Sequence, residues 1–173
     1  MQSNIPEIVL GNPVLLGVLT VLVLAVVAYQ RTLTYPEYAT IHTLKTVLFR
    51  ALDPWARKRG RRLINDKGGR EDAEFLTVWD GSARDVLTTL RSEGWDYHLV
   101  STDKRRDGDL DDGHAVIYHD NGDQTEVYVF ELDNGKTEVY GHVETATTNP
   151  EGHLSDAQTD GDAHGVISAA LSQ

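Results

Sequence analysis

The side chains best suited to bind a cation form a short cluster of aspartates. Asp107, Asp109, Asp111 and Asp112 follow one another closely, and alternating carboxylates of this kind open calcium-binding loops. An EF-hand loop needs glycine at its sixth position and a bidentate glutamate at its twelfth, where this chain has Asp112 and Tyr118. Because of these mismatches we interpret the segment as a solvated loop, and a divalent-cation site is the alternative.

The other residues that support catalysis form no recognisable motif in the sequence. The seven histidines show no pair at the spacing of a helical or strand metal site, and we expect them to be polar surface residues. His98 and His142 could meet across a sheet. The sequence has no Gly-rich phosphate loop, no G-x-S-x-G and no H-E-x-x-H, and it has no cysteine. These patterns favour a protein that is not an enzyme and has no cofactor.

Residues 71–173 have the patterns of an α+β domain. An apolar run at 74–79 predicts a strand, Ser82 and Asp85 predict a capped helix, and 95–100 alternate as a half-buried strand does. Two Asn-Gly pairs then separate alternating runs, which predicts a three-stranded meander with two-residue turns. Apolar residues at helical spacing over 163–171 predict a final helix. We expect the order β-α-β-β-β-β-α, an antiparallel sheet with one or two packed helices.

The register expected from two-residue turns divides the meander into two faces. Ile117, Tyr128 and Val139 represent the face expected to be the core. The opposite face is a candidate partner-binding surface, unless the final helix covers it. Its residues are Val116, Tyr118, Val127, Val129 and Tyr140.

The amino-terminal part contains a long uncharged segment. Asn12 and Pro13 are suited to start a helix, and residues 14–28 carry no charge. We therefore predict a single transmembrane helix over 12–33, with residues 1–11 as an external tip. A cleaved signal peptide is the alternative, but its positive charges would precede the apolar run rather than follow it.

A basic region follows the predicted span. Residues 31–70 hold ten basic and three acidic side chains, so the positive-inside rule places residues 34–173 in the cytoplasm or inside a virion membrane. Residues 34–70 are expected to form two amphipathic helices, the second beginning at Asp53-Pro54, and then a hinge. The side chains expected at the lipid bilayer surface are Tyr29, Arg31, Tyr35, Trp55, Arg57, Lys58, Arg59, Arg61 and Arg62.

The charge is unevenly distributed along the chain. Residues 71–173 hold 23 acidic and 6 basic side chains, and this self-repulsion is tolerated where salt screens it. Aspartate dominates the acids, and arginine outnumbers lysine. This composition resembles that of haloarchaeal proteins and those of haloarchaeal viruses, and an acidic mesophilic domain is the alternative. A strongly acidic domain also opposes binding to nucleic acid.

Together these features predict a non-enzymatic, membrane-anchored protein. Its acidic domain would present a surface to a protein partner. The alternative is a membrane-tethered enzyme or cation-binding protein that uses the Asp- and His-rich segment 103–114.

Overall fold

A computed structural model describes residues 13–60, 63–66, 74–101, 103–106, 109–149 and 161–172. Within these residues, five strands form an antiparallel sheet in the order β2-β8-β7-β6-β3. The strands are β2 (Phe75–Trp79), β3 (Asp96–Tyr97), β6 (Gly113–Tyr118), β7 (Asp123–Glu131) and β8 (Thr137–Thr145). The predicted α+β class with an antiparallel sheet is therefore confirmed.

The two helices predicted in this domain are also present. Helix α4 (Ala83–Ser92) begins with the expected capping box: the Asp85 backbone N–H donates to Ser82 Oγ, and the Ser82 backbone N–H donates to the Asp85 carboxylate. Helix α6 (Ala163–Leu171) begins at Asp162, whose carboxylate accepts from the Gly165 backbone N–H. Both helices pack on one face of the sheet, where they form the main apolar core with β6, β7 and β8.

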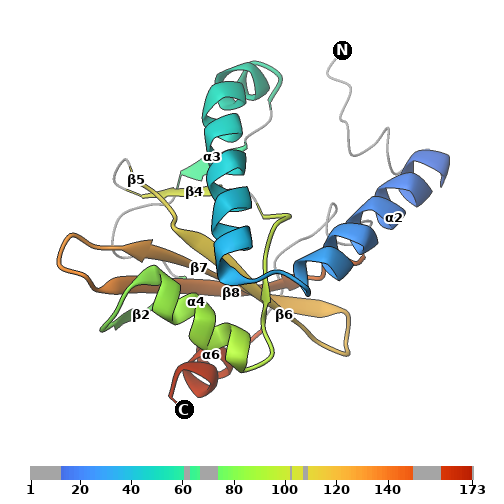
Figure 1. Cartoon of the computed structure of the whole chain (residues 1–173). Coiled ribbons are helices and arrows are strands. Elements are labelled where there is room, and N and C mark those ends of the chain that lie inside the picture. Colours follow the sequence, from blue (N-terminus) through green and yellow to red (C-terminus); the bar gives the residue numbers. More distant parts are fainter. Residues whose placement is uncertain are drawn as a thin grey trace.

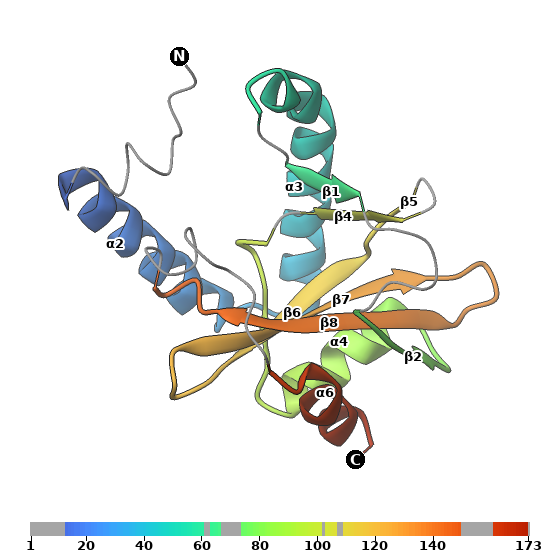
Figure 2. The same ribbon diagram turned by 180° about the vertical axis from the view of Figure 1, so that it is seen from behind.

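The opposite face of the sheet has a second, unpredicted cover. A small sheet in the order β1-β4-β5 is formed by β1 (Ile64–Asp66), β4 (Asp103–Arg106) and β5 (Asp109–Leu110). Helix α3 (Tyr35–Arg57) stands beside it. Figures 1 and 2 show the main sheet in the middle, α4 and α6 below it, and α3 with the small sheet above it. The central strands β7 and β8 are thus buried on both faces.

Both hairpin turns are one residue longer than predicted. Gly122 and Gly135 have φ of 90° and 77°, and the N–H groups of His119 and Leu132 donate to Asp123 O and Lys136 O. Each loop therefore has three residues, Asp-Asn-Gly, and its glycine occupies the left-handed conformation. The sequence Asn-Gly suits both turn types, but they set registers that differ by one residue.

Because of this difference in register, each side chain of β7 lies on the face of the sheet opposite to the predicted one. Val127 and Val129 pair with Ala115 and Val139, and all four lie in the core beneath α4 and α6. Tyr128 lies on the other face and packs there with Phe130 and Tyr140. The candidate partner residues Val116, Tyr118, Val127, Val129 and Tyr140 consequently divide between the two faces. All but the half-buried Tyr118 are buried, so they do not form one exposed surface.

The prediction of a transmembrane helix over 12–33 is wrong. Among the described residues, no helix combines the length and apolar character needed to cross a membrane. Helix α2 (Pro13–Gln30) has 18 residues, which is about 27 Å at 1.5 Å per residue. Its last turn also packs on the domain, because Gln30 is fully buried and donates to the Tyr118 hydroxyl at 3.1 Å. Residues 1–12, including the predicted external tip, lie outside the described part.

The two amphipathic helices predicted after this segment are one helix. Helix α3 begins at a capping box formed by Thr34 and Glu37 and continues through Pro54 to Arg57. Asp53 does not cap a new helix. Its Oδ1 instead accepts from the backbone N–H groups of Leu63 and Ile64 at 2.9 and 3.1 Å, and so fixes the chain that leaves α3.

The residues predicted at a membrane surface have varied surroundings. Arg31 pairs with Asp96, and Tyr35 packs edge-on against Tyr97 at 6.1 Å between ring centroids. Arg57 pairs with Asp53. Tyr29, Trp55, Lys58 and Arg59 are exposed, and the Arg59 guanidinium lies 3.9 Å from the Trp55 ring centroid. Arg61, Arg62 and most of the predicted hinge lie outside the described residues.

The register of β7 can be tested by two conservative substitutions. Val127 and Val129 are fully buried beneath the helices. Replacing both with threonine puts two hydroxyl groups into an apolar core, at roughly 1 to 3 kcal/mol each. We expect the free energy of unfolding, measured by chemical denaturation, to fall by that order. Val78→Thr, at a site 46% exposed on the edge strand β2, is the control and should have little effect.

Candidate metal centre

The structure gives the described members of the aspartate cluster different surroundings. Asp109 and Asp112 are exposed, and Asp107 lies outside the described residues. Asp111 is buried, with a side chain of 0% exposure. Its Oδ2 accepts from the Lys104 backbone N–H at 2.5 Å, while the Asp111 N–H donates to Lys104 O. This pairing with β4 turns the Asp111 carboxylate inward.

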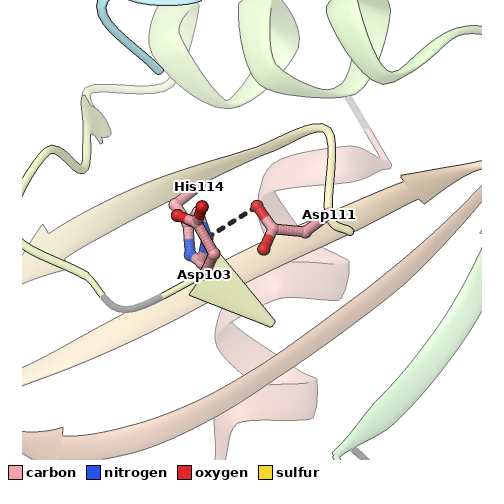
Figure 3. Close-up of side chains that lie close together, drawn as sticks. All are labelled: Asp103, Asp111 and His114. Carbon is pink, nitrogen blue, oxygen red and sulfur yellow. Dashed lines mark ion pairs between the residues drawn. The ribbon is translucent and has the colours of Figure 1, made fainter. Parts of the chain in front are cut away.

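Asp111 meets two further buried groups that can bind a metal ion. Asp103 begins β4, and His114 is the second residue of β6. One ligand atom from each of the three residues lies within 4.8 Å of the others, and all three side chains are fully buried. Figure 3 shows the Asp103 and Asp111 carboxylates close to the His114 ring.

The polar atoms of this cluster are incompletely satisfied. Asp111 Oδ1 lies 2.7 Å from His114 Nε2. Even so, neither of these atoms, nor either Asp103 oxygen, has a hydrogen-bond partner of acceptable geometry among the described residues. Buried polar groups are almost always hydrogen-bonded, and a bound ion is one way to satisfy those that are not.

Glu126 on β7 orients the imidazole of His114. Its Oε1 lies 2.8 Å from His114 Nδ1, and since an ionised carboxylate only accepts hydrogen bonds, Nδ1 carries the proton. In the neutral ring, Nε2 then carries a free lone pair that is directed to the cluster. This carboxylate–histidine arrangement is the usual support of a metal-binding histidine.

The ionisation of the cluster reflects competition between burial and charge. Burial opposes the charged form of His114, but the carboxylates of Asp111 and Glu126 outweigh it and raise the pKa of His114. Burial likewise disfavours the Asp111 carboxylate, and the charges of His114 and His42 nevertheless lower its pKa. Without a metal ion, the cluster therefore favours an ion pair between His114 and Asp111.

Helix α3 closes the cluster from the side opposite the main sheet. The Tyr38 hydroxyl accepts from the His114 backbone N–H at 2.6 Å. His42 Nε2 lies 3.3 Å from Asp111 O and 3.5 Å from Asp111 Oδ1. The Lys45 ammonium lies 2.9 Å from Asp103 Oδ1. Three consecutive turns of α3 thus reach all three members of the cluster.

A pocket of about 400 Å³ lies beside the cluster. It lies between α3 and the segment that joins β5 to β6, and Asp111 and His42 are part of its lining. His42 Nδ1 and Thr46 Oγ1, which belong to the same lining, have no hydrogen-bond partner among the described residues. Asp111 is thus the member of the cluster that borders the pocket, although its carboxylate has no exposed surface.

Comparison of the sequence with protein-family models, with characterised proteins and with solved structures finds no match. The function is therefore inferred from the residues of this site.

A second group, formed by Glu126, His142 and Glu144, has metal-ligand spacing but a different balance of charge. His142 Nε2 lies 3.4 Å from Glu126 and 3.5 Å from Glu144, and its Nδ1 lies 3.5 Å from Glu74. Burial lowers the pKa of His142, but these carboxylates outweigh it and raise the pKa to about 9. At neutral pH the charged imidazole itself is therefore the cation of this group.

The buried histidines were missed in the sequence because their contacts are non-local. We expected surface residues, but His42, His98 and His114 are buried. His98 and His142, which the sequence allowed to meet across a sheet, each approach the Glu126 carboxylate at 3.4 Å. The sequence does carry a sign of this site. Glu126 and Tyr128 alternate with Val127 and Val129 along β7, and the observed register places them on one face with His142.

The charge of His142 predicts a measurable pH dependence of stability. Its pKa rises from an ordinary value of 6.5 to about 9 on folding, which corresponds to about 3 kcal/mol. Because the folded pKa is the higher one, this stability is complete below pH 6.5 and is lost as the pH rises through about 9. We expect chemical denaturation of wild type and His142→Gln to show a difference that shrinks between pH 6 and pH 10. A constant difference would contradict a charged His142.

Proposed function

We propose that this chain is a divalent-cation-binding protein whose ligands are Asp103, Asp111 and His114. The observation that carries the proposal is the convergence of two carboxylates and an imidazole nitrogen, all fully buried. Asp103, Asp111 Oδ1 and His114 Nε2 have no hydrogen-bond partner of acceptable geometry among the described residues, although Asp103 forms an ion pair with Lys45. Their positions are fixed by β4, by the β5–β6 connection and by β6, so the site would be largely formed before the ion binds.

The donor set favours an ion of the zinc type. Zn²⁺ accepts both imidazole nitrogen and carboxylate oxygen at about 2.0 to 2.2 Å. Mg²⁺ and Ca²⁺ prefer oxygen ligands alone, and the set has no thiolate because the chain has no cysteine. We therefore expect Zn²⁺ to bind more tightly than Mn²⁺, and Mn²⁺ more tightly than Mg²⁺ or Ca²⁺.

Three protein ligands leave room in the coordination sphere. Zn²⁺ sites with three protein ligands commonly bind water or a small molecule at the fourth position. A pocket lies beside Asp111 and His42 on this side of the cluster. This arrangement supports exchangeable ion binding better than a closed structural site does.

Titration calorimetry on tag-free, chelator-treated protein tests the proposal. We expect one Zn²⁺ per chain and a gain in thermal stability on binding. Asp111→Asn should abolish both, because it removes an anionic ligand. Glu126→Gln should weaken affinity by about 10- to 100-fold, since it removes the support of His114.

Asp109→Asn is the matched control for these variants. Asp109 lies two residues from Asp111 but is exposed, so its loss should leave affinity unchanged. Wild-type protein that binds no Zn²⁺ would refute the metal centre. Equal losses in Asp109→Asn and Asp111→Asn would instead indicate non-specific attraction of cations to an acidic protein.

A second function, self-association through α3, is favoured by an exposed apolar stripe. Leu44, Leu48 and Trp55 are 66%, 54% and 57% exposed. With Ala51 they follow the alternating four- and three-residue spacing of helices that pair along an apolar seam. We propose a second copy of this chain as the partner, because it supplies the same stripe. This proposal keeps the expected interaction with a protein partner.

Light scattering during size-exclusion chromatography tests the self-association. We expect wild type to form dimers at micromolar concentration, and Leu44→Glu with Leu48→Glu to be monomeric because each buries a charge in the seam. Thr43→Glu adds one of these two charges at an exposed site about 100° around the helix, so it should remain dimeric. A wild type that is monomeric at every concentration would exclude this function.

A further inference from the structure

Lys45 occupies an unusual position for a lysine beside a candidate metal centre. Its ammonium group lies 2.9 Å from Asp103 Oδ1 and donates to Ser101 O at 3.1 Å. The Lys45 side chain is only 11% exposed, and that of Asp103 is fully buried. Lys45 therefore places a positive charge directly on one of the three proposed ligands.

A divalent ion and this ammonium group compete for the same carboxylate. A coordinated Zn²⁺ would lie about 2.0 to 2.2 Å from an Asp103 oxygen, whereas Lys45 Nζ lies 2.9 Å from Oδ1. Two like charges drawn this close to one buried group repel each other strongly, because little water separates them. Binding of Zn²⁺ to Asp103 would thus weaken the ion pair between Asp103 and Lys45, and the ion pair would weaken binding of Zn²⁺.

We propose that Lys45 is a built-in competitor of the metal ion. In the ion-free protein its ammonium group neutralises Asp103, and ion binding displaces it into the adjoining solvent. This proposal rests on the proposed metal centre and describes how that centre is regulated. Lys45 does not bind the ion. It sets the ion concentration at which the centre fills.

The competition links the centre to α3. Tyr38, His42 and Lys45 are the residues of this helix that contact the cluster or its backbone. Displacement of Lys45 removes its bond to Ser101 O as well as its pair with Asp103. Filling the centre would therefore loosen the third of these contacts while the other two hold the helix in place.

Calorimetry on Lys45→Met tests the proposal, since methionine keeps much of the side-chain length and removes the charge. We expect Zn²⁺ to bind roughly tenfold more tightly, or better, than in wild type, because the repulsion is gone. Without the ion, Lys45→Met should be less stable than wild type, because Asp103 is left buried and unpaired. Zn²⁺ should restore that stability. Lys45→Arg keeps the charge and should bind Zn²⁺ about as wild type does.

Lys58→Met is the matched control, because Lys58 is an exposed lysine at the end of the same helix. It should leave affinity and stability unchanged. Wild type that binds Zn²⁺, with Lys45→Met binding it equally or more weakly, would overturn the role of Lys45 and leave the metal centre intact. Absence of binding in both proteins would instead refute the metal centre itself.

A measurement on wild type covers the case in which Lys45→Met does not fold. Lysine acetylation by a soluble anhydride, followed by peptide mass spectrometry, reports how free each ammonium group is. We expect Zn²⁺ to raise the reactivity of Lys45 and to leave that of Lys58 unchanged. Equal reactivity of Lys45 with and without Zn²⁺, in protein shown to bind it, would overturn the proposal.

Discussion

The buried carboxylate of Glu126 is the constraint around which one side of this protein is built. It lies on the central strand β7 and is 2% exposed, and an unpaired carboxylate there would be strongly destabilising. Burial opposes its ionisation, yet Lys104, His114 and His98 outweigh burial and hold the pKa of Glu126 well below its ordinary value. His142 adds a further positive charge at 3.4 Å. Each of these partners comes from a different part of the chain.

Because Glu126 needs buried partners of positive charge, the face of the main sheet that carries it has to be covered by α3 and the small sheet. A charge cluster on an exposed sheet would be solvated and weakly coupled. Here Lys104 lies on β4 and His114 lies on β6. His42 of α3 contacts the backbone carbonyl of the neighbouring Asp111 and so covers it. The small sheet has strands of two to four residues, too short to be stable alone. Polar contacts with the main sheet therefore compensate for the small amount of apolar surface that these strands bury.

Local patterns in the sequence were sufficient to predict several helices and strands of the domain. They did not predict the face of the sheet that carries Glu126. The capping box at Ser82 and the apolar spacing of α6 depend on neighbours a few residues away, and both predictions were confirmed. The register depends on the choice between two-residue and three-residue turns, for which Asn-Gly is suitable in both cases. A shift of one residue exchanges the two faces of β7, so valines of the core were assigned to a surface.

The transmembrane prediction failed for a related reason. Hydropathy describes a segment by its own residues alone. The position of α2 also depends on the residues of the domain that its last turn contacts. Gln30 is a polar residue at the end of the apolar segment, and its side chain donates to the Tyr118 hydroxyl and accepts from the Leu99 backbone N–H. Leu33, three residues on, lies in the main core. These contacts join the end of α2 to the sheet.

The two clusters of carboxylates and histidines differ in how their charges are balanced, and contacts between distant parts of the chain set this difference. Around His142 three carboxylates surround one imidazole, so a proton is sufficient to balance much of their charge. Around His114 the proton on Nδ1 is held by Glu126, and the lone pair of the neutral ring meets Asp103 and Asp111. Two carboxylates directed at one lone pair require a cation between them. A proton on His114 together with the ammonium of Lys45 can meet that requirement, and so can one divalent ion. An ion bound as proposed would take the place of the Lys45 ammonium group beside Asp103, and its affinity would then depend on how strongly Asp103 holds that ammonium group.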